Sequence, residues 1–286
     1  MNVLITGAAG NAGQAVARVF IGAGISVRLA DVTAPPPDLK GAEFVRCDTR
    51  TVADVNAATE GVDGVVHLAA WHCAHQPAVS DATIFAVNVD GTYNVIEACR
   101  KHGIQKLVFA SSMAYGWGSV YSVTKVIGEE LCRAFHEITG ASVAMLRYHA
   151  FVPGPYLEYG VRLLRNGVDR KDVAAATLAA YQAVAERKVK LFNTIVHTSH
   201  GLPKDVQQDF RDLGPAWCEQ QLPGAKALIA KYNLALPQQV EQHDLSAAER
   251  ELGWKPTVTF LHFLQDLKTR DARGEDVSKR VVPGEL

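Results

Sequence analysis

Residues 2–20 read NVLITGAAGNAGQAVARVF, and this stretch decides the fold. The apolar run from Asn2 to Thr6 predicts a buried strand, and Gln14 to Phe20 has the apolar spacing of a helix. Between them, Gly7 permits a tight turn, Gly10 lets the backbone approach a pyrophosphate, and Gly13 lets helix and strand pack closely. Strand, loop and helix in this order predict a dinucleotide-binding unit, and the alternative is a glycine-rich turn without a ligand.

Asp31 stands at the end of the second predicted strand, which spans residues 25–30. In a dinucleotide-binding unit this is the place of the acid that binds the ribose. A carboxylate there accepts from both ribose hydroxyls and repels a 2′-phosphate, so the sequence favours NAD over NADP. The other interpretation of Asp31 is a surface residue at a strand end.

Composition excludes several classes of partner. The chain has 286 residues, a formal net charge of −1 and 48% hydrophobic residues, which is typical of a globular protein with one sizeable core. Without a block of Lys or Arg or a membrane-length apolar run, we expect no nucleic-acid or membrane partner, but a small-molecule substrate.

Cysteine usage and the start of the chain give the expected compartment. The five cysteines are odd in number and form no Cys-x-x-Cys pair, which favours reduced thiols. Because the first strand begins at Asn2, we expect no signal peptide and a cytoplasmic protein.

Strand and helix patterns alternate over the first half of the chain and predict a parallel sheet covered on both faces. The further strands are expected at 43–47, 65–70, 105–111 and 141–147, and the helices at 52–60, 81–102 and 119–139. Beyond Pro153 the pattern loosens into helices at 172–187, 204–213, 224–232 and 244–253, with a strand at 189–196.

Tyr121 and Lys125 are four residues apart in a predicted helix and therefore project from the same face. A free Tyr keeps its proton until about pH 10, and a neighbouring ammonium stabilises the phenolate. We therefore expect Lys125 to lower the pKa of Tyr121 toward the working range of an acid-base catalyst. Alone, the spacing would indicate only a solvated helix face.

Several motifs in order resemble those of the extended short-chain dehydrogenase/reductase family, in its NAD-dependent epimerase/dehydratase branch. The matching stretches are Thr6-Gly7-Ala-Ala-Gly10-Asn-Ala-Gly13, Asp31, Asp48, His67-Leu-Ala-Ala70, Asn88-Val-Asp-Gly91-Thr, Phe109-Ala-Ser-Ser112, Tyr121-Ser-Val-Thr-Lys125, Leu146-Arg-Tyr148 and the segment from Asp244 to Pro256. The resemblance runs from Met1 to about Leu267.

The resemblance implies an α/β fold, a Rossmann doubly wound parallel sheet with a smaller, mostly helical C-terminal substrate lobe. The NAD-binding domain is expected at 1–152, the lobe at 153–269 with some chain interleaved with the sheet, and a flexible tail at 270–286. The two helices at 81–102 and 119–139 carry more apolar positions than one buried stripe needs, and in the family they form a homodimer interface.

The resemblance also implies residue roles. Tyr121 is the acid-base residue, Lys125 holds the nicotinamide ribose and activates Tyr121, and Ser112 binds the reacting oxygen. The expected NAD-binding residues are Gly7, Gly10, Asn11, Ala12, Gly13, Asp31, Asp48 (toward adenine), Leu68, Ala69, Ala70, Asn88, Tyr121, Lys125 and Tyr148. The expected substrate residues are Trp71, His72, Ser112, Met113, His149, Arg162 and Arg165.

Each weaker signal has a plainer alternative. His149 contacts substrate or is a satisfied interior histidine, and Arg162 and Arg165, with Arg170, bind a substrate anion or face solvent. Tyr115 and Trp117 stack on a ligand or pack in the core. The stretch from Trp71 to His75 lacks the second ligand pair of a zinc site, so no metal is predicted.

Departures from the family pattern narrow the expected function. Only eight residues separate Ser112 from Tyr121, the segment 153–172 is compact, and Arg147-Tyr148-His149-Ala150 lacks the Asn of sugar-nucleotide epimerases. The outline resembles that of uronate dehydrogenases, although Met113-Ala114 replaces their Asn-His.

We therefore predict an NAD-dependent oxidoreductase that transfers a hydride at a hydroxyl or ketone carbon of a small sugar or sugar acid. The alternatives are a nucleotide-sugar 4-epimerase and a non-catalytic NAD-binding sensor.

Overall fold

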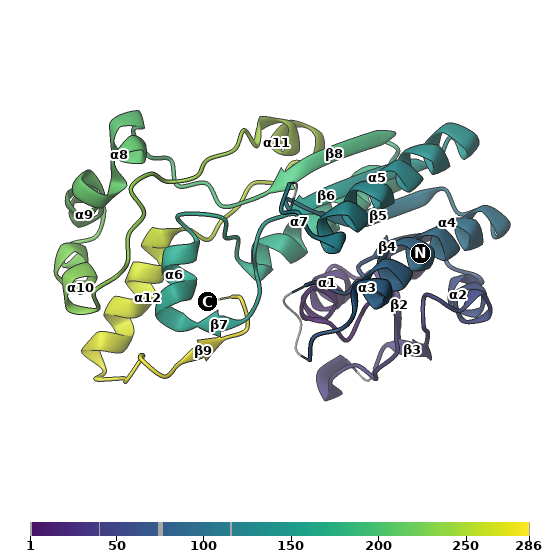
Figure 1. Cartoon of the computed structure of the whole chain (residues 1–286), viewed down its shortest axis with the longest axis horizontal. Coiled ribbons are helices and arrows are strands. Elements are labelled where there is room, and N and C mark those ends of the chain that lie inside the picture. Colours follow the sequence, from purple (N-terminus) through teal and green to yellow (C-terminus); the bar gives the residue numbers. More distant parts are fainter. Residues whose placement is uncertain (1, 40, 74–76, 115, 286) are drawn as a thin grey trace. The chain divides into compact units, whose positions relative to one another are not determined.

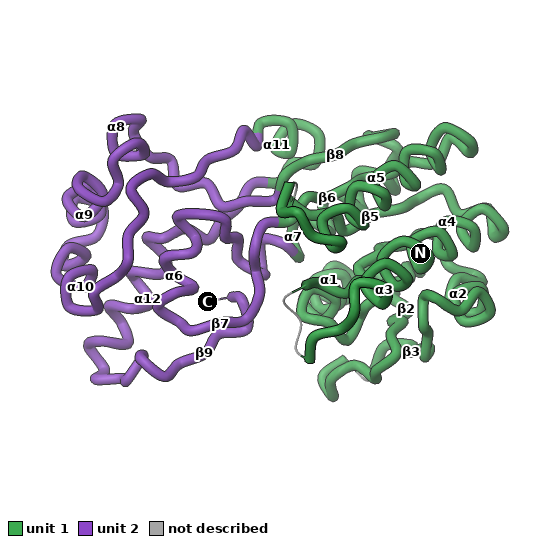
Figure 2. The backbone as a smooth tube through the Cα atoms, viewed as in Figure 1, with its two compact units in different colours: residues 1–148, 174–195, 246–254 green, residues 149–173, 196–245, 255–286 purple. Residues whose placement is uncertain are grey.

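The computed structural model describes residues 2–39, 41–73, 77–114 and 116–285. The chain forms two compact units, each made of several segments (Figure 2). The first unit contains residues 1–148, 174–195 and 246–254, and the second contains 149–173, 196–245 and 255–286. The chain thus leaves the first unit after Tyr148, a few residues before the predicted boundary at 152, and returns to it twice.

A seven-stranded sheet forms the centre of the first unit, in the order β3-β2-β1-β4-β5-β6-β8. The strands are β1 (Asn2–Thr6), β2 (Ser26–Asp31), β3 (Glu43–Arg46), β4 (Gly64–His67), β5 (Lys106–Ser112), β6 (Ser142–Tyr148) and β8 (Leu191–Val196). Pairing is parallel from β3 through to β6. The strand order reverses beside β1, and such a switch point is where doubly wound sheets bind ligands. The predicted Rossmann fold is confirmed.

Helices cover both faces of this sheet. They are α1 (Asn11–Gly22), α2 (Val52–Thr59), α3 (Asp81–Phe85), α4 (Gly91–Lys101), α5 (Val120–Thr139), α7 (Arg170–Ala185) and α11 (Ser246–Leu252). Figure 1 shows α4 and α5 side by side in front of the strands. Leu4 of β1 belongs to a core shared with α2, α4 and α5, while its neighbours Val3 and Ile5 are also fully buried. Since side chains alternate along a strand, both faces are packed.

The predicted helix at 81–102 is interrupted. A π-helical segment, Ala86–Asp90, separates α3 from α4. It contains Asn88, whose side chain is buried and bonded to the backbone of Trp71. Insertion of such a turn is common at functional sites, and here it directs a polar side chain inward.

The second unit is mostly helical. Its helices are α6 (Tyr156–Arg162), α8 (Lys204–Gln208), α9 (Phe210–Gln221), α10 (Ala225–Lys231) and α12 (Phe260–Ala272). Aromatic side chains fill its core, among them Tyr156, Phe210 and Phe263. Gly160 of α6 lies against α12, and a Cβ there would stand 2.3 Å from the Phe263 ring. Within the described residues, no helix has both the length and the apolarity to cross a bilayer.

The described C-terminal residues are packed, in contrast to the flexible tail predicted at 270–286. Strand β9 (Val281–Val282) pairs antiparallel with β7 (Gly154–Pro155), and α12 continues to Ala272. The side chain of Val277 is 2% exposed and that of Val282 is 3% exposed. The segment is rich in charge, but these widely spaced valines reach the core of the second unit and hold it in place.

Neighbouring valines test this packing. Val282→Ala should lower the free energy of unfolding by about 1–3 kcal/mol, because it removes two buried methyl groups. Val281→Ala is the matched control, since Val281 is 67% exposed, and it should change stability by less than about 0.5 kcal/mol. Urea unfolding of the whole chain measures both, and equal effects of the two substitutions would refute a packed C-terminus.

Candidate active site

In the glycine-rich loop after β1, two glycines have no room for a side chain and a third borders open space. Gly7 has φ +68°, and a Cβ there would stand 2.7 Å from the Ala69 nitrogen. A Cβ on Gly13 would stand 2.1 Å from the Gly7 carbonyl oxygen. At Gly10, by contrast, a Cβ would meet only that same oxygen, at 3.2 Å. The missing side chain of Gly10 therefore leaves space beside the N-terminus of α1, where a pyrophosphate fits.

Asn11 and Ala12 belong to the first turn of α1, directly after Gly10. Backbone N–H groups of a first helical turn lack partners within the helix, so they can donate to a phosphate. Contact of Asn11 and Ala12 with the cofactor stays a prediction.

Asp31 lies beside the loop, as the prediction of a ribose-binding acid requires. One carboxylate oxygen accepts from the Ala9 N–H at 3.0 Å and the other from the Thr33 N–H at 3.1 Å. Asp48, the predicted adenine contact, pairs with Arg50 at 2.6 Å, and this partner lowers the pKa of the Asp48 carboxyl. The adenine contact of Asp48 stays a prediction.

A buried chain of hydrogen bonds connects β1, β4 and α4, and sequence reasoning gave three of its members, Thr6, His67 and Thr92, no role. Thr92 donates its only hydroxyl proton to the Asn88 carbonyl at 2.6 Å, so it accepts from His67 Nε2 at 3.0 Å. Burial lowers the pKa of His67 to about 3, and this neutral ring accepts from the Thr6 hydroxyl at 2.7 Å through Nδ1. In the sequence, the histidine of the His67-Leu-Ala-Ala70 motif was the signal that could have indicated this network.

The segment after β4 is held by this network. Leu68 and Ala69 each donate a backbone N–H to the Thr6 hydroxyl oxygen at 3.3 Å. Together with Ala70 they form the turn over Gly7, where the prediction placed cofactor contacts. Gly7 approaches Ala69 so closely that a side chain at Gly7 would clash, so the loop and this segment fit together only with glycine at this position.

Asn88 positions that turn through its side chain. Its Oδ1 accepts from the Trp71 N–H at 2.8 Å, and its Nδ2 donates to the Trp71 carbonyl and to Thr124 Oγ1, both at 3.0 Å. Thr124 in turn donates to the Tyr121 carbonyl at 2.7 Å. The structure thus places Asn88 between this segment and α5, with its amide group bonded inside the protein, and its contact with the cofactor stays a prediction.

Ser112 and Tyr121 come together although only eight residues separate them. Ser112 is the last residue of β5 and Tyr121 lies in the first turn of α5. Burial raises the pKa of Tyr121, and the nearby Ser112 side chain opposes this rise. Ser112 Oγ accepts from the Ala114 N–H at 3.1 Å, which fixes its direction. Both residues are buried, so the short connection still assembles the predicted pair.

Lys125 lies on the same face of α5 as Tyr121, as predicted, but its effect on Tyr121 differs from the expectation. Its Nζ donates to the Ala110 carbonyl at 2.8 Å and lies 5.8 Å from the centre of the Tyr121 ring. Burial lowers the pKa of Lys125 to about 8 and raises that of Tyr121 to about 12. The predicted lowering of the Tyr121 pKa is absent here because desolvation of the phenolate outweighs the opposing effect of Ser112.

The predicted substrate loop meets Tyr121. The His72 ring lies edge-on to the Tyr121 ring with centroids 4.3 Å apart, and Trp71 packs against the cluster that contains Tyr121. Trp117 is half exposed, with its ring 6.5 Å from that of His72. Tyr115 and residues 74–76, which include His75 of the rejected zinc motif, lie outside the described residues.

Met113 and Tyr148 hold the end of β5. The Met113 N–H donates to the Tyr148 carbonyl at 3.1 Å, and the Tyr148 hydroxyl bonds Thr177 Oγ1 at 2.7 Å. Burial raises the pKa of Tyr148 well above its usual range. Tyr148 was predicted to contact the cofactor, but its hydroxyl already has a partner within the first unit.

The other predicted substrate residues belong to the second unit. The Arg162 guanidinium donates to the Val152 carbonyl at 2.7 Å, and that of Arg165 donates to the Ala235 carbonyl at 2.9 Å. Arg170 pairs with Glu285 at 2.9 Å. These bonds use part of each guanidinium, and anion binding by Arg162 or Arg165 stays a prediction. His149 is buried in this unit.

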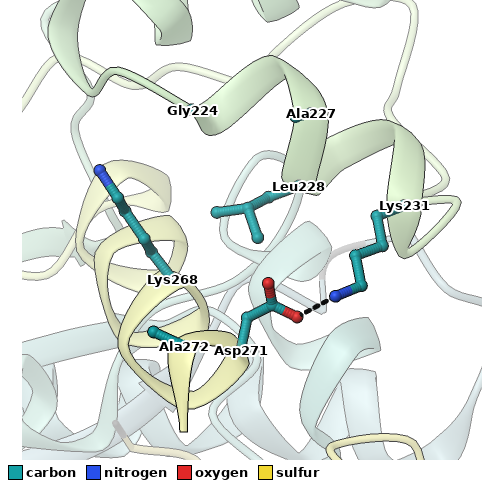
Figure 3. Close-up of a pocket in the computed structure, with 7 residues that line it drawn as sticks. All are labelled: Gly224, Ala227, Leu228, Lys231, Lys268, Asp271 and Ala272. Carbon is teal, nitrogen blue, oxygen red and sulfur yellow. Dashed lines mark hydrogen bonds and ion pairs between the residues drawn. The ribbon is translucent and has the colours of Figure 1, made fainter. Parts of the chain in front are cut away.

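A shallow pocket of about 320 Å³ lies between α10 and α12 of the second unit (Figure 3). Its two lysines are already engaged, since Lys231 pairs with Asp271 at 2.5 Å and Lys268 donates to the Pro223 carbonyl at 2.7 Å. The rest of its lining is mostly apolar. It offers no acid-base or nucleophilic pair comparable to Ser112 and Tyr121.

Comparison with known proteins agrees with this geometry. The uronate dehydrogenase of Pseudomonas putida is 27% identical over 238 residues, which span 73% of this chain and 86% of that protein. The uronate dehydrogenase of Agrobacterium fabrum is 30% identical over 197 residues, which span 63% of this chain and 72% of that protein.

Solved structures share the fold. A short-chain dehydrogenase/reductase superfamily protein from Agrobacterium tumefaciens with bound NAD superposes with a TM-score of 0.71 over 96% of this chain and 98% of that chain, at 20% identity. A UDP-galactose 4-epimerase gives a TM-score of 0.66 over 96% of this chain and 99% of that chain, also at 20% identity.

A sequence model of the NAD dependent epimerase/dehydratase family matches residues 3–162, a range that contains the glycine loop, Asp31 and the group of Ser112, Tyr121 and Lys125. More than half of the chain is therefore accounted for by one family, and the match covers the helices and strands of the first unit except α7, β8 and α11. This chain belongs to the NAD-dependent epimerase/dehydratase family, a branch of the extended short-chain dehydrogenases/reductases.

Proposed function

We propose that this protein is an NAD-dependent oxidoreductase that acts at a hydroxyl or ketone carbon of a small sugar or sugar acid. The observation that carries the proposal is that Ser112, at the carboxyl end of β5, and Tyr121, in the first turn of α5, are buried close together. The glycine loop follows the carboxyl end of β1 in the same parallel sheet, so both features lie at the edge where such folds bind ligands.

The residues of the first unit fit the dinucleotide. The open position at Gly10 and the N-terminus of α1 would hold the pyrophosphate, and Asp31 would accept from the adenosine ribose. When bound, NAD supplies the nicotinamide carbon that accepts or returns a hydride.

The protein contributes proton transfer and orientation. Ser112 would donate a hydrogen bond to the reacting oxygen and hold it near the Tyr121 hydroxyl. Tyr121 would then exchange its proton with that oxygen as the carbon is oxidised or reduced. Lys125 lies one helical turn away and would contact the ribose, after exchanging its bond to the Ala110 carbonyl.

A free sugar acid is the favoured substrate class. The chain spans 86% of the length of the P. putida uronate dehydrogenase. Its short connection from Ser112 to Tyr121 and its compact segment 153–172 leave little chain to cover a nucleotide. Nucleotide-sugar epimerisation is the second candidate, favoured by the structural likeness to UDP-galactose 4-epimerase.

We also propose a cytoplasmic homodimer. The three helices α3, α4 and α5 expose large apolar side chains, namely Phe85, Tyr93, Val123 and Val126. A second copy covering this face would remove them from water. Free cysteines, four of them buried, suit a reducing compartment.

The catalytic assignment is tested by replacing the phenol. Tyr121→Phe should reduce NAD-linked turnover at least ~100-fold, since general acid-base catalysis contributes about 10²–10⁴. NAD binding, measured by calorimetry, should survive. Turnover should be followed at the nicotinamide absorbance across uronic acids, neutral aldoses and nucleotide sugars, and it should be fastest with a uronic acid.

Tyr93→Phe is the matched control, because Tyr93 is 50% exposed on α4, and it should leave turnover unchanged. Full activity of Tyr121→Phe would disprove the mechanism. Turnover with nucleotide sugars alone would disprove the sugar-acid substrate and leave the catalytic pair intact.

The cofactor preference is tested at Asp31. The wild-type chain should bind NAD more tightly than NADP. Asp31→Asn removes the charge that repels the 2′-phosphate, so it should reduce the preference for NAD, measured as the ratio of the two dissociation constants, by about tenfold, or ~1.4 kcal/mol. Asp38→Asn, an exposed carboxylate of the same unit paired with Arg18, is the control. A wild-type preference for NADP would contradict the assignment of Asp31.

The dimer is tested by placing a charge on the apolar face. Val123→Glu should shift the chain toward monomer in light scattering at micromolar concentration, because burying an unpaired carboxylate is costly. Val52→Glu, at an equally exposed valine of α2 (59%, against 54% for Val123), should not. A monomeric wild type would rule out the proposed assembly.

A further inference from the structure

Three imidazoles and one carboxylate meet inside the second unit. They belong to His149, His197, Glu241 and His243, and one side-chain N or O atom of each lies within 4.8 Å of all the others. His149 directly follows β6, His197 directly follows β8, and the remaining pair lies between α10 and α11. Three separate segments thus converge on one point.

Backbone groups lie beside the two buried imidazoles. His197 Nε2 donates to the Arg165 carbonyl at 2.8 Å, and the His149 ring lies near the backbone of the adjacent residue Asn166. The other ring nitrogens, His149 Nε2 and His197 Nδ1, are buried and have no hydrogen-bond partner among the residues that the structure describes. His149 is 7% exposed and His197 is fully buried.

Such an arrangement is expected of metal-ligating histidines. In metal sites one ring nitrogen donates to a carbonyl or carboxylate, which fixes the tautomer and turns the other nitrogen toward the ion. A buried nitrogen without a partner is unfavourable, and two of them in neighbouring rings favour a ligand that both can bind. The ring centroids of His149 and His197 are 4.3 Å apart, and each lies within 5 Å of the His243 centroid.

We propose that His149, His197, His243 and Glu241 bind one divalent transition-metal ion of the Zn²⁺ type. His149 Nε2 and His197 Nδ1 are two of the ligands. His243 Nε2 and the Glu241 carboxylate already lie 2.9 Å apart, and the ion replaces the proton between them. Ligands of a tetrahedral zinc site with bonds of about 2.0–2.1 Å stand roughly 3.4 Å apart, so binding requires only side-chain rotation inward from the observed separations.

The donor set selects a cation over an anion. His197 donates through Nε2 to the Arg165 carbonyl, so its Nδ1 presents a lone pair. The cluster consists of imidazoles and one carboxylate, and it offers no guanidinium or ammonium group to a substrate carboxylate or phosphate. The side chain of Glu241 is 39% exposed and that of His243 is 19% exposed, which gives an ion a route from solvent.

The ion would act on stability. It would join the chain after β6 and after β8 to the segment at 241–243, all within the second unit. Because the unfolded chain lacks the preformed site, binding would raise the melting temperature, and tighter binding would raise it further.

Cobalt gives a direct test, using the full chain without an affinity tag after dialysis against a chelator. Titration with Co²⁺ should give the visible absorption bands of a four-coordinate nitrogen and oxygen site, and Zn²⁺ should displace it at one ion per chain. Zn²⁺ should also raise the melting temperature. Neither readout depends on NAD or on activity.

Variants tie the signal to these residues. His197→Asn should abolish the cobalt spectrum, and Glu241→Gln, which keeps the shape of the side chain, should weaken Zn²⁺ binding at least ~10-fold. His262→Asn, at an exposed histidine of the same unit, is the control and should bind like wild type. Circular dichroism confirms that each variant is folded.

Two results would overturn the site. One is a wild-type chain that gives neither the cobalt bands nor a Zn²⁺ isotherm saturating at one ion per chain. The other is a folded His197→Asn or Glu241→Gln variant that binds Zn²⁺ as tightly as the wild type.

Discussion

The close passage of α1 over the end of β1 is the constraint on which the rest of the first unit depends. A Cβ on Gly13 would fall 2.1 Å from the Gly7 carbonyl oxygen, and one on Gly7 would fall 2.7 Å from the Ala69 nitrogen. Helix, loop and the turn after β4 can therefore meet only through bare backbone. That contact leaves N–H groups at the helix N-terminus and open space at Gly10, which together form the proposed dinucleotide site.

Buried polar side chains connect this site to the catalytic helix. The series runs from Thr6 through His67 and Thr92 to Asn88, and from the Asn88 amide through Thr124 to the Tyr121 carbonyl. Every bond in it lies away from water, where an unpaired member would be costly, so the series has one favourable arrangement. It explains how Tyr121 and Ser112 can meet across a short connection: α5 is held from its inner face, and the connecting loop need not position it.

The two units contain different parts of the structure. The first contains the sheet, the glycine loop and the proposed acid-base pair, whereas the second has its own aromatic core and a C-terminal strand that pairs with β7. In the first unit, the buried series from Thr6 to Tyr121 is made of bonded polar groups. In the histidine cluster of the second unit, two ring nitrogens, His149 Nε2 and His197 Nδ1, are buried without a partner among the described residues.

The sequence by itself determined the features that depend on local order: the strand, glycine loop and helix at residues 2–20, the alternation that builds the parallel sheet, and the shared face of Tyr121 and Lys125. Burial and long-range contact were decided only by the tertiary structure. The neighbouring ammonium of Lys125 led us to predict a lowered pKa for Tyr121, but desolvation raises it. The polar groups of Asn88 and Tyr148 form hydrogen bonds inside the protein. Two buried valines, Val277 and Val282, hold the charged C-terminal segment against the core. His149, His197 and His243 showed no motif spacing, because residues brought together by three separate segments leave no periodic signal in the chain.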